Sequence, residues 1–359
     1  MLLAIDIGNS SISLGLFDLT ATDPRPTPAL TAKLASAVGR TADEYAVIIR
    51  GLLTDKGYGG AISVAVMGSV VPQLTHTLES AIQKLGGDTP IPVTHIGGGV
   101  RTGISLRVDD PSALGADIVT NASAAVSLYG APVIFLDFGT ATVCGAVNMA
   151  RELVGVSIAP GVTTALEGLR AAAAQIPYME LKAPDTVLGK NTAAALRSGL
   201  VLGTACIIDG MLDRIKAELK LPKNAALPMV ATGGLAELVL PACTHTIANE
   251  PDLTLLGLYF IYKVTAEREA AAAERIALVV CGDALCPTTS NGKTAQRRAG
   301  IKNRATHGVI AATVIFFRRI RIGLADNECA IGARADERYV IRYDRAGTEI
   351  EFRILFVGS

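Results

Sequence analysis

Apolar residues along this chain occur in short runs that alternate with more polar stretches. Residues 3–18, 61–71, 133–148 and 153–162 are rich in leucine, β-branched and small residues and are bounded by Gly, Pro or Asp, a pattern typical of strands. Several of the stretches between them are typical of helices, among them an Ala-rich one over 112–129. Strands mixed with helices in this way predict an α/β fold.

Signals at the ends of the runs locate individual elements. Thr41 and Glu44 have the spacing of a capping box, which predicts a helix over "YAVIIRGLL". Pro72 ends the run 61–71 and predicts that a helix follows that strand. We further expect strands over 29–36, 91–96 and 229–234, helices over 112–129 and 163–174, one long or two short helices over 190–220, and a closing apolar helix over 253–264.

One pattern occurs twice. Residues 3–18 read "LAIDIGNSSISLGLFD" and residues 133–148 read "VIFLDFGTATVCGAVN", so that an apolar strand, Asp, a hydrophobic residue, Gly and small polar residues recur with an offset of 131 residues. A single Asp-x-Gly hairpin also fits an ordinary hairpin with a structural Asp. Two copies with matching flanks are hard to attribute to chance, and they predict two related lobes whose turns clamp a polyphosphate between them.

The two turns combine glycine, small polar residues and a carboxylate. Gly8 and Gly139 let the backbone bend and approach a ligand closely. Because carboxylates repel phosphate, Asp6 and Asp137 need an intervening cation or water, which indicates metal-assisted handling of a nucleotide. The residues that leave N–H and O–H donors for anionic oxygens are Asn9, Ser10 and Ser11 in the first turn and Thr140, Ala141 and Thr142 in the second.

Composition narrows the class of function. The chain has 359 residues, of which 50% are hydrophobic and 18% charged, enough for two core-bearing lobes and a remainder. Its formal net charge is zero, so no overall charge attracts it to nucleic acid or to an anionic membrane, and small-molecule chemistry is favoured. Residue 1 runs straight into a strand, and the most apolar stretch of the tail, 308–317, is too short to span a membrane. We therefore expect a cytoplasmic protein whose 6 cysteines are free, buried thiols.

The character of the sequence changes near residue 265. The last 94 residues hold 13 Arg and 2 Lys against 11 acidic residues, and they begin with "AEREAAAAER", which predicts a helical connector. We expect the arginines, including those at 318–321, on the solvated surface of a small appended module, because no aromatic-stacking pattern supports nucleic-acid binding. A zinc site at Cys281 and Cys286 is not expected, since only His307 follows them.

As a set, the motifs resemble those of type III pantothenate kinases, a family of the actin-like ATPase superfamily. The resemblance covers roughly residues 1–264, and its motifs are "DIGNSS" (6–11), "SVVP" (69–72), "LGAD" (114–117) followed by "NASAA" (121–125), "DFGTAT" (137–142), "APGV" (159–162), "GKNT" (189–192), "ATGGLA" (231–236) and "LTLLGL" (253–258). It implies two related actin-like (ribonuclease H-like) lobes, 1–115 and 116–264, with the nucleotide cleft between them, and a C-terminal extension over 265–359.

The same resemblance implies an activity and its partners. The implied reaction is ATP-dependent phosphorylation of pantothenate to 4′-phosphopantothenate, the first step of coenzyme A biosynthesis. The implied cofactors are ATP, Mg²⁺ and a monovalent cation, K⁺ or NH₄⁺. It also implies a homodimer in which the second subunit completes the active site. The apolar segment 171–181 fits a strand at the dimer interface, and packing in the core of one chain explains it nearly as well.

Individual roles also follow from the resemblance. Asp117 matches the family's proton acceptor, although an Asp at a helix N-terminus is also favoured by the helix dipole alone. Asp137 matches the position that holds the monovalent cation, and Gly233 and Gly234 allow close approach of the adenosine. The ATP phosphate loop comprises Asp6 (which also serves Mg²⁺), Ile7, Gly8, Asn9, Ser10, Ser11, Ile12 and Ser13, with Thr140 as the second phosphate contact; the substrate positions are Val108, Gly115, Ala116, Asp117, Ile118 and Thr192.

The acceptor positions depart from the family pattern. Ile118 stands where an Arg would contact substrate, and Val108 stands where a Tyr is expected, with Asp110 in place of an Asn. The loss of a cation and a hydroxyl should weaken pantothenate binding. Lys190 and Arg107 are the basic residues able to replace the missing cation.

Two other functions therefore stay open. One is a non-catalytic regulatory relative of the Bvg accessory factor type, and the other is a kinase of the same fold that acts on another small alcohol or acid. Retention of Asp6, Asp117 and Asp137 favours catalysis, whereas Val108, Ile118 and the Arg-rich tail favour a non-catalytic role.

Overall fold

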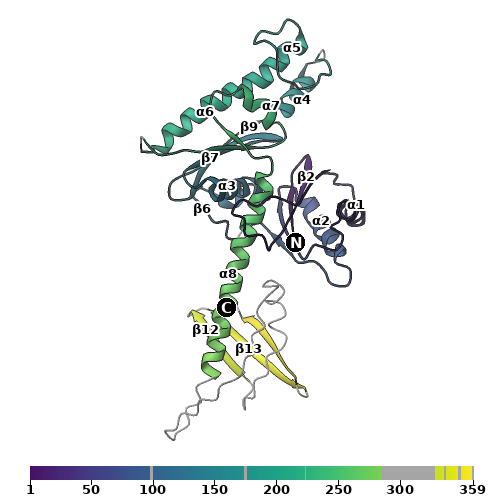
Figure 1. Ribbon diagram of the computed structural model, residues 1–359, viewed down its shortest axis with the longest axis vertical. Helices are drawn as coiled ribbons and strands as arrows, with labels where there is room; N and C mark the ends of the chain where they lie inside the picture. The colour runs from purple at the N-terminus through teal and green to yellow at the C-terminus, as the bar shows by residue number, and fades with distance from the viewer. Residues whose placement is uncertain are drawn as a thin grey trace. The chain divides into compact units, whose positions relative to one another are not determined.

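The computed structural model describes residues 1–97, 100–173, 176–222, 224–284, 328–334, 337–346 and 349–357. The chain divides into two units, Met1–Thr265 and Ala266–Ser359. The first unit contains two mixed β-sheets with helices packed against them (Figure 1), which confirms the predicted α/β class.

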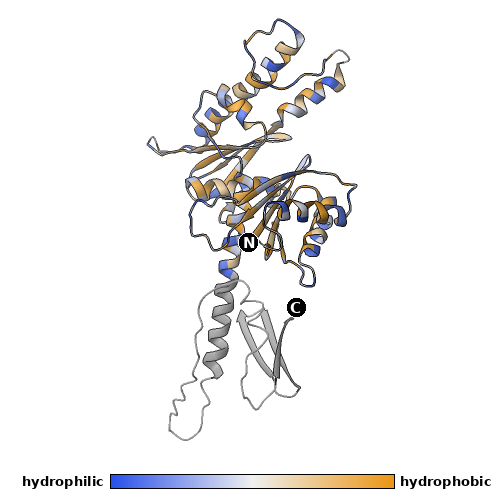
Figure 2. Cartoon of the chain, turned by 45° about the vertical axis from the view of Figure 1, so that its right-hand side comes forward, coloured by the Kyte–Doolittle hydropathy of each residue, from blue (hydrophilic) through white to orange (hydrophobic). Residues whose placement is uncertain are grey.

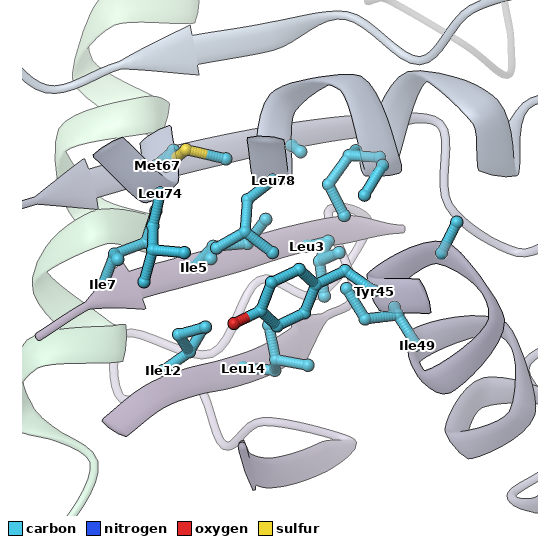
Figure 3. Packing of buried hydrophobic residues seen from close by; sticks show 14 of the residues in the cluster. Leu3, Ile5, Ile7, Ile12, Leu14, Tyr45, Ile49, Met67, Leu74 and Leu78 are labelled. Carbon is cyan, nitrogen blue, oxygen red and sulfur yellow. The ribbon is translucent and has the colours of Figure 1, made fainter. Parts of the chain in front are cut away.

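The first sheet has the strand order β3-β2-β1-β4-β5. β1, β2 and β3 pair antiparallel, whereas β1, β4 and β5 run parallel. Helices α1 (Ala42–Asp55) and α2 (Pro72–Leu85) cover one face, where Tyr45 and Leu78 pack against alternate residues of β1 and β2 (Figure 3). The strands are β1 (Leu2–Ile7), β2 (Ser11–Phe17), β3 (Leu30–Ala35), β4 (Val64–Ser69) and β5 (Val93–His95).

The second sheet repeats this plan, with the order β11-β10-β7-β8-β9-β6. β7, β8 and β9 pair antiparallel, β7, β10 and β11 run parallel, and β6 is an added edge strand parallel to β9. The repeat seen in the sequence therefore extends from the hairpins to both sheets. The strands are β6 (Ser105–Leu106), β7 (Val133–Phe138), β8 (Ala141–Val147), β9 (Glu152–Pro160), β10 (Met229–Thr232) and β11 (Ala248–Asn249).

Helices of the second lobe are α3 (Ala116–Tyr129), α4 (Val162–Ala172), α5 (Thr192–Arg197), α6 (Gly203–Leu219) and α7 (Ala236–Val239). A π-helical turn, Ser198–Leu202, joins α5 to α6, so one continuous helical run replaces the two short helices that the sequence also allowed. Within the described residues, this run alone is long and apolar enough to cross a membrane, a test that core helices of soluble proteins also pass. Ala205, Ile208 and Leu212 of α6 are buried in the core of the second lobe.

The first turns of helix α8 (Leu253–Ala284) pack on the face of the first sheet that α1 and α2 leave open. The rings of Phe17 on β2 and Tyr259 on α8 have centroids 5.0 Å apart. Gly257 lets α8 approach α3 closely, because a Cβ there would lie 2.1 Å from the carbonyl oxygen of Thr120. The start of α8 therefore contacts the first sheet and α3 together, and Figure 2 shows that apolar residues concentrate in the strands and at these packed faces.

Local signals in the sequence located the starts of helices α1 and α2. The capping box is confirmed, since Oγ1 of Thr41 accepts from the N–H of Glu44 at 3.3 Å and Oε2 of Glu44 accepts from the N–H of Thr41 at 2.7 Å. Pro72 is the first residue of α2. Helix α3 begins later than residue 112, because Pro111–Ala113 form a separate 3-10 turn. The closing helix continues through the predicted connector and ends at Ala284.

Two expectations need correction. The interface strand proposed at 171–181 is wrong for the residues described there, since 171 and 172 end α4 and 176–181 form neither helix nor strand. The expectation of buried thiols holds for Cys144, whereas Cys206 is exposed and Cys243 is half-buried; all three are free.

The second unit contains an antiparallel sheet in the order β12-β13-β14. Its strands are β12 (Glu328–Arg334), β13 (Glu337–Ala346) and β14 (Glu349–Val357). The sequence predictions for Cys286, His307 and 308–321 lie outside the described residues.

Candidate functional site

The two glycine turns of the repeated hairpins meet. Oγ of Ser10, in the β1–β2 turn, lies 3.0 Å from Oγ1 of Thr140, in the β7–β8 turn. Each turn is closed in the same way, because the N–H of Gly8 donates to the carbonyl oxygen of Ser11 at 3.0 Å and that of Gly139 donates to Ala141 at 3.0 Å. The two hairpins thus present hydroxyl-bearing turns to one place, and a polyphosphate held between them stays a prediction.

The turns differ in length. Asp6 pairs across its hairpin with Ser13, whereas Asp137 pairs with Val143, so the first turn holds one residue more than the second. The 131-residue offset therefore holds only as far as the turn. Ile7 and Ile12, assigned to the phosphate loop, are fully buried in the core of the first lobe, and only their backbone can reach a ligand.

Three carboxylates lie close enough to influence one another. Burial raises the pKa of Asp6 to about 7, and the negative charges of Asp117 and Asp137 add to the effect. Burial, with the charge of Asp117, raises the pKa of Asp137 to about 6. Burial also raises the pKa of Asp117, against the effect of the hydrogen bond that its Oδ1 accepts from the N–H of Ile118 at 2.9 Å. Such a cluster attracts cations and can accept a proton near neutral pH.

The side chain of Asn121 fixes Asp137. Its Nδ2 donates to Oδ2 of Asp137 at 3.0 Å, and its Oδ1 accepts from Oγ1 of Thr254 at 2.8 Å. Asn121 is buried on α3, and Thr254 lies in the first turn of α8. Sequence reasoning missed both residues, although they lie in "NASAA" and "LTLLGL", two motifs quoted for the family resemblance without a role.

Glycines shape the space behind the second turn. A Cβ on Gly161 would lie 2.3 Å from the carbonyl oxygen of Gly139, and a Cβ on Gly233, which has φ +98°, would lie 2.5 Å from the backbone of Phe138. The close approach at Gly233 is therefore to the protein's own backbone. Gly234 instead faces open space, with no other atom within 4 Å of the position a Cβ would occupy.

The acceptor positions of the first turn of α3 are partly buried. Gly115 is the N-cap of α3, and a Cβ there would lie 2.3 Å from Oδ1 of Asp117, so a side chain at this position would displace the carboxylate. Ala116, Asp117 and Ile118 form the first turn of the helix. Ile118, in place of an Arg, is only 7% exposed.

The segment before α3 is more open. Val108 is half-buried, and Asp110 caps the 3-10 turn by accepting from the N–H of Ser112 at 2.9 Å, a role that an Asn also fills. Arg107, which could have replaced the missing cation, is instead paired with Glu152 at 3.3 Å.

Two further residues assigned to the acceptor lie elsewhere. Thr192 is the first residue of α5, and Lys190 precedes its N-cap. Both are exposed, and α5 lies at the far end of the second lobe from α3 (Figure 1). Within one chain, the structure does not bring Thr192 and Lys190 to Asp117.

Comparison with known proteins adds independent evidence. The sequence pattern of a family described as type III pantothenate kinase matches residues 2–214. A type III pantothenate kinase of Thermobifida fusca is 40% identical over 267 residues, which is 73% of this chain and 99% of that protein. One from Streptomyces griseus is 38% identical over 273 residues, 75% of this chain and 100% of that protein. About a quarter of the present chain thus has no counterpart in these relatives.

A solved structure described as a conserved putative Baf family transcriptional activator from Campylobacter jejuni overlaps less closely. Its identity is 16% and its TM-score 0.45, with 73% of this chain and 97% of that chain covered. An overlap of this extent bears on neither mechanism nor substrate.

Proposed function

The chain belongs to the type III pantothenate kinase family and phosphorylates pantothenate with ATP in coenzyme A biosynthesis, and on this premise we propose which residues perform the reaction. The contact between Ser10 and Thr140, with three mutually influencing carboxylates nearby, is the observation that carries the proposal. We infer that the phosphates bind at this contact, in a cleft between the proposed lobes, 1–115 and 116–264.

Asp117 is the proton acceptor. In the reaction, the pantothenate hydroxyl oxygen forms a bond to the γ-phosphorus of ATP, the bond from that phosphorus to the bridging oxygen breaks, and the hydroxyl proton passes to Asp117. Phosphoryl transfer depends mostly on positioning and charge neutralisation, so a carboxylate with a raised pKa is a sufficient base. Gly115 leaves the room in which this carboxylate lies.

The turns hold the phosphates. Asn9, Ser10 and Ser11 in the first turn and Thr140 in the second offer N–H and O–H donors to phosphate oxygens. A backing hydrogen bond supports this role, because Oγ1 of Thr164 on α4 donates to the carbonyl oxygen of Thr140 at 2.7 Å and thereby helps fix the second turn. The second turn is thus held in place without nucleotide, which lowers the entropic cost of binding.

The carboxylates fit the cations of the family. Within the described residues, no three His, Cys, Asp or Glu side chains could hold a metal ion together. Mg²⁺ typically binds through one or two carboxylates, water and substrate phosphates, and Asp6 at the end of β1 can supply one such carboxylate. Asp6 is our candidate for Mg²⁺, and Asp137, oriented by Asn121, for K⁺ or NH₄⁺. When bound, these cations would neutralise charge on the phosphates.

We also infer a homodimer, in the cytoplasm. Several apolar side chains between residues 116 and 264 are exposed: Ile158 on β9, Leu169 on α4, Tyr178, whose ring lies 4.5 Å from the guanidinium of Arg170, and Val187 and Leu188 in the segment before α5. The same segment leads to Thr192, which lies away from Asp117 of its own chain. A second copy packed on these side chains would bury them and supply Thr192 to the neighbouring cleft.

The test is ATP turnover by the purified protein with Mg²⁺ and K⁺, with and without pantothenate, for the wild type and for Asp117→Asn. We expect pantothenate-dependent ADP release that Asp117→Asn reduces at least about a hundredfold. ATP binding without such turnover would refute pantothenate as the acceptor. The buried Ile118 would then favour the second candidate, a kinase of the same fold for another small alcohol.

A further inference from the structure

Strand register places a lysine in line with the first carboxylate of the cleft. Asp6 on β1 pairs with Ser13 on β2, and Ser13 pairs with Lys33 on β3. Residues directly opposite each other on neighbouring strands point to the same face of a sheet. Asp6, Ser13 and Lys33 therefore form a row on the face opposite the core under α1 and α2, and this is the face on which α8 packs.

Strand β3 is fixed against the first turn just beyond Lys33. The N–H of Ser36 donates to the carbonyl oxygen of Ser10 at 3.2 Å, and Oγ of Ser36 donates to that of Gly8 at 2.5 Å. Neighbouring strands lie about 4.8 Å apart, so β3 is roughly 10 Å from β1, a gap that the four-carbon stem of a lysine largely crosses. The backbone thus holds Lys33 where its ammonium can reach the space in front of Asp6.

Charge in the cleft is consistent with this placement. The positive charge of Lys33 acts to lower the pKa of Asp6, Asp137 and Asp252, although burial is the larger effect on each and raises it. These carboxylates come from β1, from β7 and from the residue ahead of α8, so the ammonium acts on both lobes. Lys33 is exposed, and in the part of the chain that the structure describes no carboxylate oxygen lies within 4.0 Å of its Nζ.

We propose that Lys33 is a phosphate-binding residue, whose ammonium contacts the β- or γ-phosphate of ATP held between the two turns. The inference rests on the proposed nucleotide site. A lysine on an edge strand also discourages pairing with other sheets, a role that requires only a charge on the edge. That role does not require the alignment of Lys33 with Asp6 or the hydrogen bonds from Ser36 to the first turn, both of which place Lys33 beside the proposed nucleotide site. A phosphate ligand would supply the negative partner for its exposed ammonium.

Calorimetric binding tests this role without depending on the acceptor. The proteins are the full-length wild type, Lys33→Met, Lys33→Arg and the control Lys84→Met; Lys84 pairs with Asp43 at 2.6 Å between α2 and α1. The probes are the non-hydrolysable ATP analogue AMP-PNP with Mg²⁺, and adenosine. We expect Lys33→Met to weaken AMP-PNP binding about tenfold or more and to leave adenosine binding and the melting temperature unchanged. Lys33→Arg should retain most of the affinity, and Lys84→Met should match the wild type.

Three outcomes would decide against the inference. Wild-type AMP-PNP affinity in Lys33→Met would overturn it, and so would an equal loss for AMP-PNP and adenosine, or a loss explained by a lower melting temperature. If Lys33→Met weakens the binding of AMP-PNP but not of adenosine, the role of Lys33 is supported. If the wild type at the same time fails to phosphorylate pantothenate, pantothenate is refuted as the acceptor. In turnover assays, the variant should raise KM for ATP more than KM for pantothenate.

Discussion

The side-chain oxygens of Ser10 and Thr140 lie 3.0 Å apart across 130 residues of sequence. Ser10 lies in the β1–β2 turn of the first sheet and Thr140 in the β7–β8 turn of the second, close to the carboxylates near the ends of β1 and β7. A phosphate chain bound between the turns would take the place of this contact. The two hydroxyls should therefore act together on ATP and leave the acceptor unaffected.

Replacing either hydroxyl tests this idea. We expect Ser10→Ala and Thr140→Val each to raise KM for ATP by roughly tenfold to a hundredfold, the range for loss of one hydrogen bond to a charged group. KM for pantothenate should change little. In the double variant the effects should be less than additive, because both residues contact one ligand. Thr20→Ala, which removes an exposed hydroxyl bonded to Asp18, is the control; fully additive effects would contradict a shared phosphate.

Much of this arrangement could be read from the sequence, because its signals are local. Gly8 and Gly139 mark the turns, and Thr41 with Glu44 marks the start of α1. The unequal turn lengths could not be read, since both turns begin with the same Asp-x-Gly spacing and strand pairing alone fixes their exits. The hydrogen bond from Thr254 to Asn121 could not be predicted either, because the two residues are 133 positions apart in the sequence and lie on different helices.

In the acceptor region, the sequence predicted less than it did for the turns. The residue types at positions 108 and 118 were evident departures, but burial of Ile118 depends on how α3 packs. From the sequence, Arg107 was a candidate to replace the missing cation. In the structure it forms an ion pair with Glu152, on the strand that pairs with β6. Positions chosen by resemblance thus carry a role only where the tertiary structure leaves the side chain free.

The raised pKa of Asp6 should make the folded protein less stable as pH rises toward neutrality. Its pKa is about 7 in the folded protein and near 3.8 when unfolded, so between these values the folded state binds the extra proton. The free energy of unfolding should therefore fall as pH rises through this window, and Asp137, with a pKa of about 6, acts in the same direction. Without nucleotide or divalent cation, we expect a lower melting temperature at pH 7.5 than at pH 5.5.

Asp6→Asn separates this effect from other titrations. The variant should melt higher than the wild type at pH 7.5, by the equivalent of about 1–3 kcal/mol, and its melting temperature should vary less with pH, as scanning calorimetry would measure. Asp18→Asn is a matched control, because hydrogen bonds from Thr20 lower the pKa of Asp18 and it stays ionised throughout the window. A wild-type melting temperature that rises from pH 5.5 to 7.5 would contradict the expected sign.

The two departures in the acceptor region should respond differently to reversal. Val108 is half-buried, so the position has room for a larger side chain, and Val108→Tyr, which restores the expected hydroxyl, should lower KM for pantothenate about threefold to tenfold. Ile118 is 7% exposed, so Ile118→Arg should instead lower stability by about 2–4 kcal/mol. Steady-state kinetics and thermal melting distinguish these effects. A stable Ile118→Arg protein with a lower KM would show that this position faces the substrate.

Thr192 provides a test of the second subunit. If it completes the cleft of a partner copy, a mixed dimer of an Asp117→Asn chain and a Thr192→Ala chain contains one intact site, formed by Asp117 of one chain and Thr192 of the other. Co-expression of two inactive variants should then restore up to about a quarter of the wild-type activity, since half of randomly formed dimers are mixed and each has one working site. Leu188→Glu, which places a charge on the exposed apolar surface, should convert the protein to a monomer in light scattering and abolish this recovery. If Thr192 acts within its own chain, every site in the mixture carries one defect, and co-expression restores nothing.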